Sequence, residues 1–84
     1  MPYINKVSRE YLDSYIVDIS KGISSTGDFT YCIFKLMKIL CEKEKNFAKL
    51  SSLIGGLECA KTEFYRRIVA PYEDEKIKEN GDVK

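Results

Sequence analysis

The sequence contains no histidine and no tryptophan among its 84 residues. Without histidine the chain has no Ser-His or Cys-His pair and no histidine-ligated metal site, and it lacks the commonest general base near neutral pH. The phosphate-binding signatures GxxxxGK[ST] and GxGxxG are also absent. These absences argue against most enzyme classes, so we expect no catalytic activity and no metal or other cofactor.

Long apolar runs are missing too. The first ten residues, MPYINKVSRE, lack the apolar stretch of a secretory signal, and no segment approaches the roughly 20 apolar residues of a membrane span. The cysteines at 32, 41 and 59 are odd in number and widely spaced, which is unlike a disulfide framework or a CxxC metal knuckle. We expect a cytoplasmic protein, in the host cytoplasm if a phage encodes it, with no membrane partner.

A chain of this length has room for one domain at most. We expect a single helical domain over 1–84, with an N-terminal arm at 1–7 and a polar C-terminal helix or tail at 71–84. Hydrophobic residues make up 44% of the sequence, too many for a disordered chain. The net charge of +1 argues against a dedicated binder of polyanions, so nucleic acid is an unlikely partner.

Apolar side chains recur every three or four residues, and strict alternation of apolar and polar residues is missing almost everywhere. This pattern predicts an all-α fold. The predicted elements are three amphipathic helices, the third the longest, at 8–21, 28–43 and 46–70, plus a short C-terminal helix after Pro71. Ser8 and Asp28 are the expected N-caps of the first two helices, and Gly22 and Gly81 are the expected ends of the first and last.

Two adjacent glycines, Gly55 and Gly56, fall in the middle of the third predicted helix. Each costs roughly 1 kcal/mol relative to alanine, so the pair needs a reason. One alternative is a kink or break at this point. A second is close helix packing, because Gly55 and Gly56 stand four residues before Cys59 and Ala60 and so form a small-residue face. A ligand phosphate at the glycines is the third.

The second predicted helix is apolar around more of its circumference than one stripe. A monomer of three short helices cannot easily cover so much apolar surface, so we expect a homo-oligomeric bundle in which the partner is the chain itself. The residues expected at the interface are Gly55, Gly56, Phe64, Pro71 and Tyr72.

Charge is unevenly distributed along the chain. Residues 35–67 carry a net charge of +4, whereas residues 68–84 carry a net charge of −2. This asymmetry permits head-to-tail docking between subunits and the binding of small anions, although a solvated helix face is the simplest explanation.

The most site-like cluster is Arg66 and Arg67, beside Tyr65 and one turn after Lys61. Guanidinium groups suit phosphate, and a tyrosine ring can stack on a base. Glutamates in the same helix, at 58 and 63, can pair with the arginines instead, so salt bridges and anion contact stay open as alternatives. The residues expected to bind a ligand are Tyr11, Tyr15, Lys61, Tyr65, Arg66 and Arg67.

The two ends of the sequence carry a resemblance. The opening MPYI and the stretch from Ile54 to Lys84, which contains EFYRRIVAPYEDEKIKENGDV, resemble a family of short microbial and phage proteins. Members of that family begin with MPYI and end in EFYRRxVAPYEDxKIxxNGDV. The resemblance implies no particular activity.

A weaker resemblance is to small helical phage proteins that sequester the cyclic oligonucleotide signals of CBASS immunity. It is carried by the succession of Gly56, Phe64, Arg66 or Arg67, Val69, Ala70 and Pro71. This resemblance implies a compact hexamer with nucleotide pockets between subunits, lined by Tyr, Lys, Arg and Thr.

Two functions follow as hypotheses. In the first, the protein is a non-enzymatic binder that sequesters a nucleotide-type immune signal, such as a cyclic oligonucleotide, at subunit interfaces, as a phage or mobile-element counter-defence. In the alternative, it is a homo-oligomeric interaction or assembly subunit with no small ligand. A third hypothesis is nucleic-acid binding through the basic middle of the chain, residues 35–67. It has less support than the other two, because the net charge of the whole chain is only +1.

Overall fold

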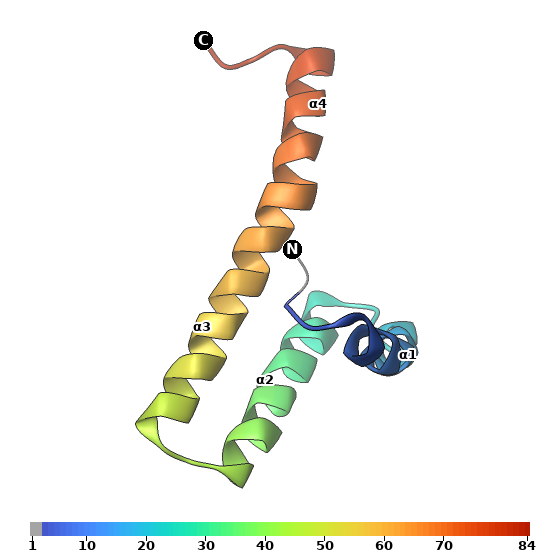
Figure 1. The fold of residues 1–84 in the computed structure, drawn as a ribbon. Coiled ribbons are helices and arrows are strands. Elements are labelled where there is room, and N and C mark those ends of the chain that lie inside the picture. Colours follow the sequence, from blue (N-terminus) through green and yellow to red (C-terminus); the bar gives the residue numbers. More distant parts are fainter. Residues whose placement is uncertain (1–2) are drawn as a thin grey trace. The chain divides into compact units, whose positions relative to one another are not determined.

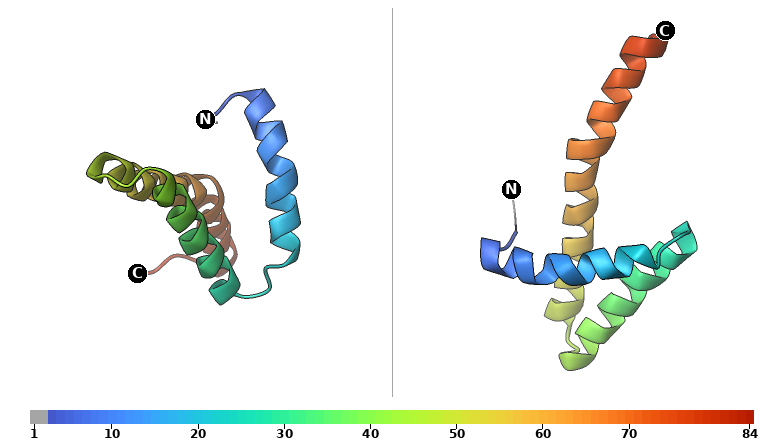
Figure 2. Two further views of the ribbon diagram at one scale, coloured as in Figure 1. Left: turned by 90° about the horizontal axis from the view of Figure 1, so that it is seen from below. Right: turned by 90° about the vertical axis from the view of Figure 1, so that its right-hand side faces the viewer.

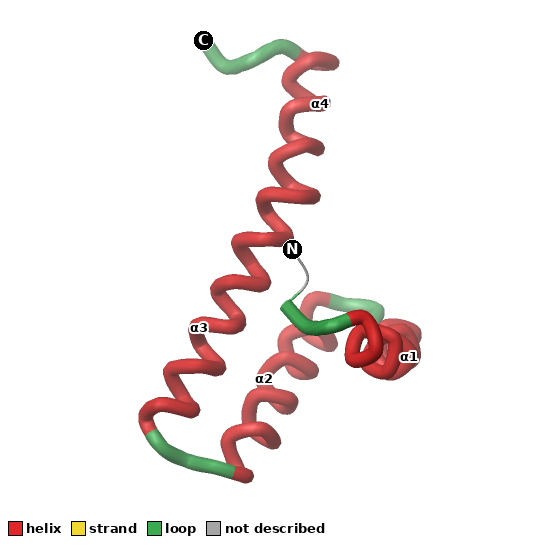
Figure 3. Tube along the Cα trace, viewed as in Figure 1, coloured by secondary structure: helices red, strands yellow, loops and turns green. Residues whose placement is uncertain are grey.

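The computed structural model describes residues 3–84, and their regular secondary structure is helical throughout (Figures 1 and 3). The all-α prediction is therefore confirmed. The chain forms three helical segments, and the third, residues 47–80, is the longest at 34 residues, as predicted. The elements are α1 (Lys6–Lys21), α2 (Thr26–Lys43), α3 (Phe47–Phe64), the π-helical turn η1 (Tyr65–Val69) and α4 (Ala70–Asn80).

The chain divides into two units, Met1–Leu40 and Cys41–Lys84. The first unit holds α1 and most of α2, which diverge from the short connection between them (Figure 2). The second unit holds the end of α2 and the whole third segment. A single domain over 1–84 stays a prediction.

Helix α1 begins earlier than predicted. The Asn5 side-chain oxygen accepts a hydrogen bond from the Ser8 amide at 2.9 Å, so Asn5 is the N-cap and Ser8 lies inside the helix. Asparagine is as good an N-cap as serine, so either residue type can fill this role. The predicted N-terminal arm is shorter for this reason, and its first two residues lie outside the described ones. The helix ends at Gly22, as predicted.

Helix α2 also begins earlier, at Thr26 rather than after Asp28. The Asp28 amide donates to the Ser25 hydroxyl at 3.0 Å, which makes Ser25 the capping residue. The Asp28 carboxylate accepts from the amide and the hydroxyl of Ser24 at 2.9 and 3.1 Å. These bonds, the backbone one foremost, hold the pKa of Asp28 below its ordinary value. A carboxylate in the first turn is also favoured by the helix dipole.

Helix α3 starts after Asn46, whose side chain accepts from the Lys49 amide at 2.9 Å, as the prediction of a helix from residue 46 implies. It then runs through Gly55 and Gly56 without interruption, so a break at the glycines is wrong. A Cβ placed on either glycine meets no atom within 4 Å, apart from the backbone of its own helix turns. Within the second unit, no side chain packs closely against these glycines.

The third segment passes Pro71 by widening one turn. The Ala70 amide bonds to the Tyr65 carbonyl, five residues back instead of the usual four. Proline has no amide hydrogen, and in an α-helix its ring collides with the carbonyl four residues earlier. A π turn adds a residue at that point and relieves the collision. The predicted C-terminal helix is thus present as α4, but it continues from α3 without a loop, and it ends at Gly81, with φ +81°, as predicted.

None of the described residues is buried. In the second unit, Phe47 and Phe64 on α3 keep 85% and 60% of their surface exposed. On α2, five half-buried residues form a stripe, and this side of the helix comes nearest to a core. The stripe consists of Cys32, Ile33, Met37, Leu40 and Cys41. The apolar stripes predicted for the helices are therefore present, but within its own unit each one stays largely uncovered.

Candidate functional site

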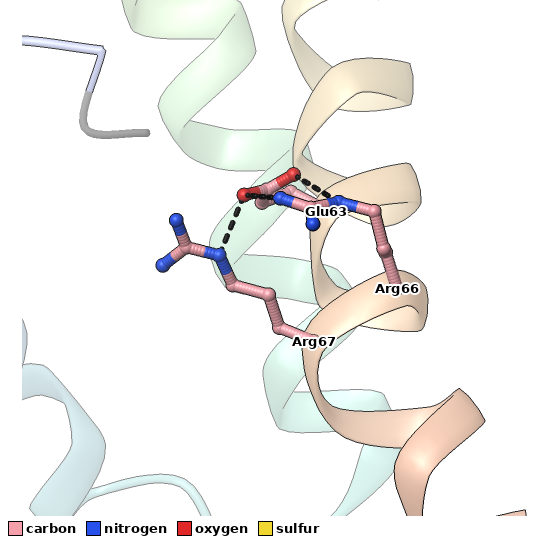
Figure 4. A network of polar contacts seen from close by, with 3 residues as sticks. All are labelled: Glu63, Arg66 and Arg67. Atoms are coloured by element: carbon pink, nitrogen blue, oxygen red, sulfur yellow. Dashed lines mark hydrogen bonds and ion pairs between the residues drawn. The ribbon is translucent and has the colours of Figure 1, made fainter.

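The Glu63 carboxylate lies between two guanidinium groups (Figure 4). Arg66 donates to it twice, Nη2 to Oε1 at 2.8 Å and Nε to Oε2 at 3.3 Å, and Arg67 Nε lies 2.6 Å from Oε1. The spacings of three and four residues put all three side chains on one side of the helix. The bonds from Arg66, and then the charges of both arginines, hold the pKa of Glu63 below its ordinary value. The salt-bridge alternative is therefore realised for both arginines.

The cations of this cluster stay open to solvent. The side chains of Arg66 and Arg67 are 65% and 52% exposed, whereas that of Glu63 is 23% exposed. Lys61 pairs with Glu58 at 3.4 Å and is 74% exposed. Because two guanidinium groups share one carboxylate, the Glu63–Arg66–Arg67 cluster carries an excess positive charge. An anion in solution can compete with Glu63 for these donors.

Tyr65 has a partner that the sequence did not indicate. Its hydroxyl lies 3.4 Å from each carboxylate oxygen of Glu73, on α4. The spacing of eight residues is outside the usual three- and four-residue pairs, so no pattern pointed to it. About half of Tyr65 remains exposed, so its ring stays accessible.

Tyr11 and Tyr15 form an aromatic pair on α1. Their ring centroids are 5.2 Å apart with an interplanar angle of 60°, an edge-to-face arrangement. A hydrogen bond with Tyr11 raises the pKa of Tyr15. These two predicted ligand residues are thus brought together, in the first unit, while the predicted cations gather in the second.

The predicted interface residues are exposed. Phe64 and Tyr72 are about 60% exposed, and Lys76 lies over the Tyr72 ring at 5.5 Å. Pro71 is the second residue after the π turn. The two glycines are open on α3.

An apolar hollow of about 490 Å³ lies in the first unit, where α1 and α2 approach their connection. No expected site residue lies in this hollow. Ile23, an apolar residue in the polar connection, is the one signal that could have indicated it. Its lining holds no charged side chain, so it suits apolar groups rather than phosphate. The lining residues are Ile16, Ile19, Ser20, Ile23, Phe29, Cys32, Ile33 and Leu36.

Two kinds of feature are absent from residues 3–84. No group of three or more His, Cys, Asp or Glu side chains is placed to hold a metal ion there. No helix in that range is long and apolar enough to span a membrane.

Residues 1–83 match the family model described as Domain of unknown function (DUF6899). The chain belongs to the DUF6899 family. The match spans both ends of the sequence on which the first resemblance rests. None of the curated proteins and none of the solved structures matches the chain. A function for this DUF6899 chain must therefore be argued from its own residues.

Proposed function

We propose that this DUF6899 chain is a non-enzymatic subunit that assembles with copies of itself. The observation that supports the proposal is that none of residues 3–84 is buried within its own unit, although the sequence is 44% hydrophobic. Large apolar residues are exposed on every helix, among them Val7 at 77% and Phe34 at 64%. Monomeric proteins rarely leave so much contiguous apolar surface in water, and helices of this kind gain their stability from packing.

A second copy is the partner that the sequence favours. The basic middle and the acidic C-terminal part of the chain are complementary in charge, so one copy can dock on another through opposite charges. Subunits of this kind often have no stable folded monomer, and their stability then depends on protein concentration.

Sedimentation velocity over a range of concentrations, with far-ultraviolet circular dichroism on the same samples, tests the proposal. We expect an oligomer at micromolar concentration that dissociates on dilution with a parallel loss of helicity. A monomer that sediments as a compact particle, with helicity independent of concentration, would overturn it, because the two units would then cover each other.

Sequestration of a nucleotide-type signal is the second candidate, as a property of the same oligomer. The observation that favours it is the exposed cluster of Lys61, Arg66 and Arg67 with the accessible ring of Tyr65 beside it. Such a cluster offers guanidinium donors to phosphate and an aromatic face to a base. A cyclic oligonucleotide held between subunits, in a phage counter-defence, is the form of this candidate that the weaker resemblance suggests.

A further inference from the structure

We propose that two copies of the chain pair through α3, antiparallel and crossing at Ala60, so that Phe64 of each copy packs on Gly56 of the other. The inference rests on the proposed self-assembly and specifies its interface.

The contact surface is a ridge on α3. Gly56, Ala60 and Phe64 follow one another at intervals of four residues, which places them in one row along the helix surface. All three lie in the regular part of α3, before the π turn, so the row is unbroken. Phe64 is 60% exposed, and a Cβ on Gly56 would meet open space. The row therefore has a bulky residue at one end and an empty place at the other.

The row is complementary to itself. Ala60 stands four residues after Gly56 and four before Phe64, so a twofold axis through Ala60 brings the bulky end of each copy to the empty end of the other. Small residues at the crossing let the two backbones approach closely. Such an isologous contact is closed by its own symmetry, which is the commonest arrangement of homodimers. It also gives Gly56 a reason to remain glycine in an unbroken helix.

The charges at the two ends of the third segment favour the antiparallel direction. Residues 73–75, which are three acids, lie 13 to 15 residues after Ala60 and so face the region around residues 45–47 of the other copy. That region, residues 43–49, has a net charge of +2 from three lysines and Glu44. A parallel pair would instead place the acids of one copy beside those of the other, which is unfavourable.

Gly55 provides a matched control for Gly56, because the proposed pairing leaves Gly55 outside the contact although the sequence predicted both glycines at the interface. It is the neighbouring residue, in the same helix, and equally open. One residue further along turns an α-helix by about 100°, so Gly55 lies away from the row. Leucine at either position favours the helix over glycine, so neither variant is expected to unfold it.

Two substitutions test the contact, with sedimentation equilibrium as the readout. We expect Gly56→Leu to raise the dimer dissociation constant about 10- to 100-fold, because its side chain fills the place of Phe64. Gly55→Leu leaves this constant within about threefold of the wild type. Adding Phe64→Ala to Gly56→Leu restores part of the affinity, because the bulky and small residues are exchanged. Equal effects of the two glycine variants would overturn the proposed contact.

The direction of the pair is tested by a distance. A variant with Cys32→Ser, Cys41→Ser, Cys59→Ser and Lys78→Cys carries one spin label per chain. An antiparallel crossing at Ala60 separates the two labels by about 54 Å, from 18 residues on each side at 1.5 Å per residue. A separation below about 25 Å would indicate a parallel pair and overturn the inference. Absence of any oligomer in the wild type would instead refute the proposed function, so the two failures are distinguishable.

Discussion

The hydroxyl of Tyr65 reaches both carboxylate oxygens of Glu73, at 3.4 Å each, across the π-helical turn. Eight residues of helix rise about 12 Å, so the contact needs the tyrosine and glutamate side chains to extend toward each other along the helix surface. The contact joins the start of η1 to α4 on the far side of Pro71. It therefore braces the part of the segment where proline removes a backbone hydrogen bond.

The first prediction concerns this brace. Tyr65→Phe removes the hydroxyl and leaves the ring, so we expect faster amide hydrogen exchange in residues 70–75, by a few-fold, with little change in residues 50–60. Hydrogen exchange followed by NMR measures both regions in one experiment. Tyr72→Phe is the matched control, and an equal effect from that variant would contradict the brace.

The second prediction concerns the π turn. Pro71→Ala supplies an amide hydrogen and removes the ring, so the turn is expected to tighten into a regular α-helix. The helix should gain stability of about 1 kcal/mol or more, since proline is the least favourable helix residue. NMR contacts between residues five apart at 65–70 should disappear. Their persistence in the variant would show that Pro71 is not the cause of the π turn.

The third prediction is a loss of stability in acid. The pKa values of Asp28 and Glu63 are lowered in the folded chain, so both carboxylates stabilise the fold fully above their ordinary values of 3.8 and 4.5. This stabilisation is lost as the pH falls below those values and through the lowered ones. Thermal melting from pH 7 to pH 3 should therefore show a constant Tm down to about pH 5 and a fall below it.

Two variants show which carboxylates cause the fall of the Tm in acid. Asp28→Asn and Glu63→Gln each remove one titrating group, and each should lower the Tm at pH 7 by a few degrees and flatten its dependence on pH in acid. Glu10→Gln is a control on the surface of α1, where the ion pair with Lys6 is long, at 4.0 Å, and both side chains are mostly exposed. A pH profile unchanged in all three variants would show that other groups cause the acid loss.

The fourth prediction separates ligand binding from assembly. If the second candidate function holds, Arg66→Ala abolishes retention of a cyclic oligonucleotide while the oligomer survives. Glu63→Gln should tighten retention severalfold, because the carboxylate no longer competes for the two guanidinium groups. Isothermal titration with a panel of cyclic oligonucleotides measures both. Unchanged affinity in Arg66→Ala would remove this cluster from any ligand site.

The helix ends show which helix boundaries can be predicted from the sequence and which cannot. Asn46, Gly22 and Gly81 act at the ends where the pattern placed them, because their conformational preferences are local. The starts of α1 and α2 were misplaced, because Asn5 and Ser25 compete with Ser8 and Asp28 for the same role. All four are good caps, and the choice among them depends on geometry that the residue types do not settle.

The π turn and the contacts of the candidate site show which features local sequence patterns cannot predict. Pro71 marked the right place, but whether a helix ends there or widens depends on the turn before it. The pairing of Glu63 with Arg66 and Arg67 follows from spacings of three and four residues and was foreseen as one alternative. The contact of Tyr65 with Glu73 was not, because it needs the side-chain positions themselves.

Native mass spectrometry of the protein purified from cells is the sharpest test of self-assembly, and denaturing extraction then identifies any bound compound. We expect an oligomer, with an intact mass that is a whole multiple of the 9.7 kDa chain. An additional stoichiometric mass of a few hundred daltons, released as a nucleotide, would support the second candidate function, sequestration of a nucleotide-type signal by that oligomer. A single chain of 9.7 kDa at all micromolar concentrations would show that the protein does not assemble with itself.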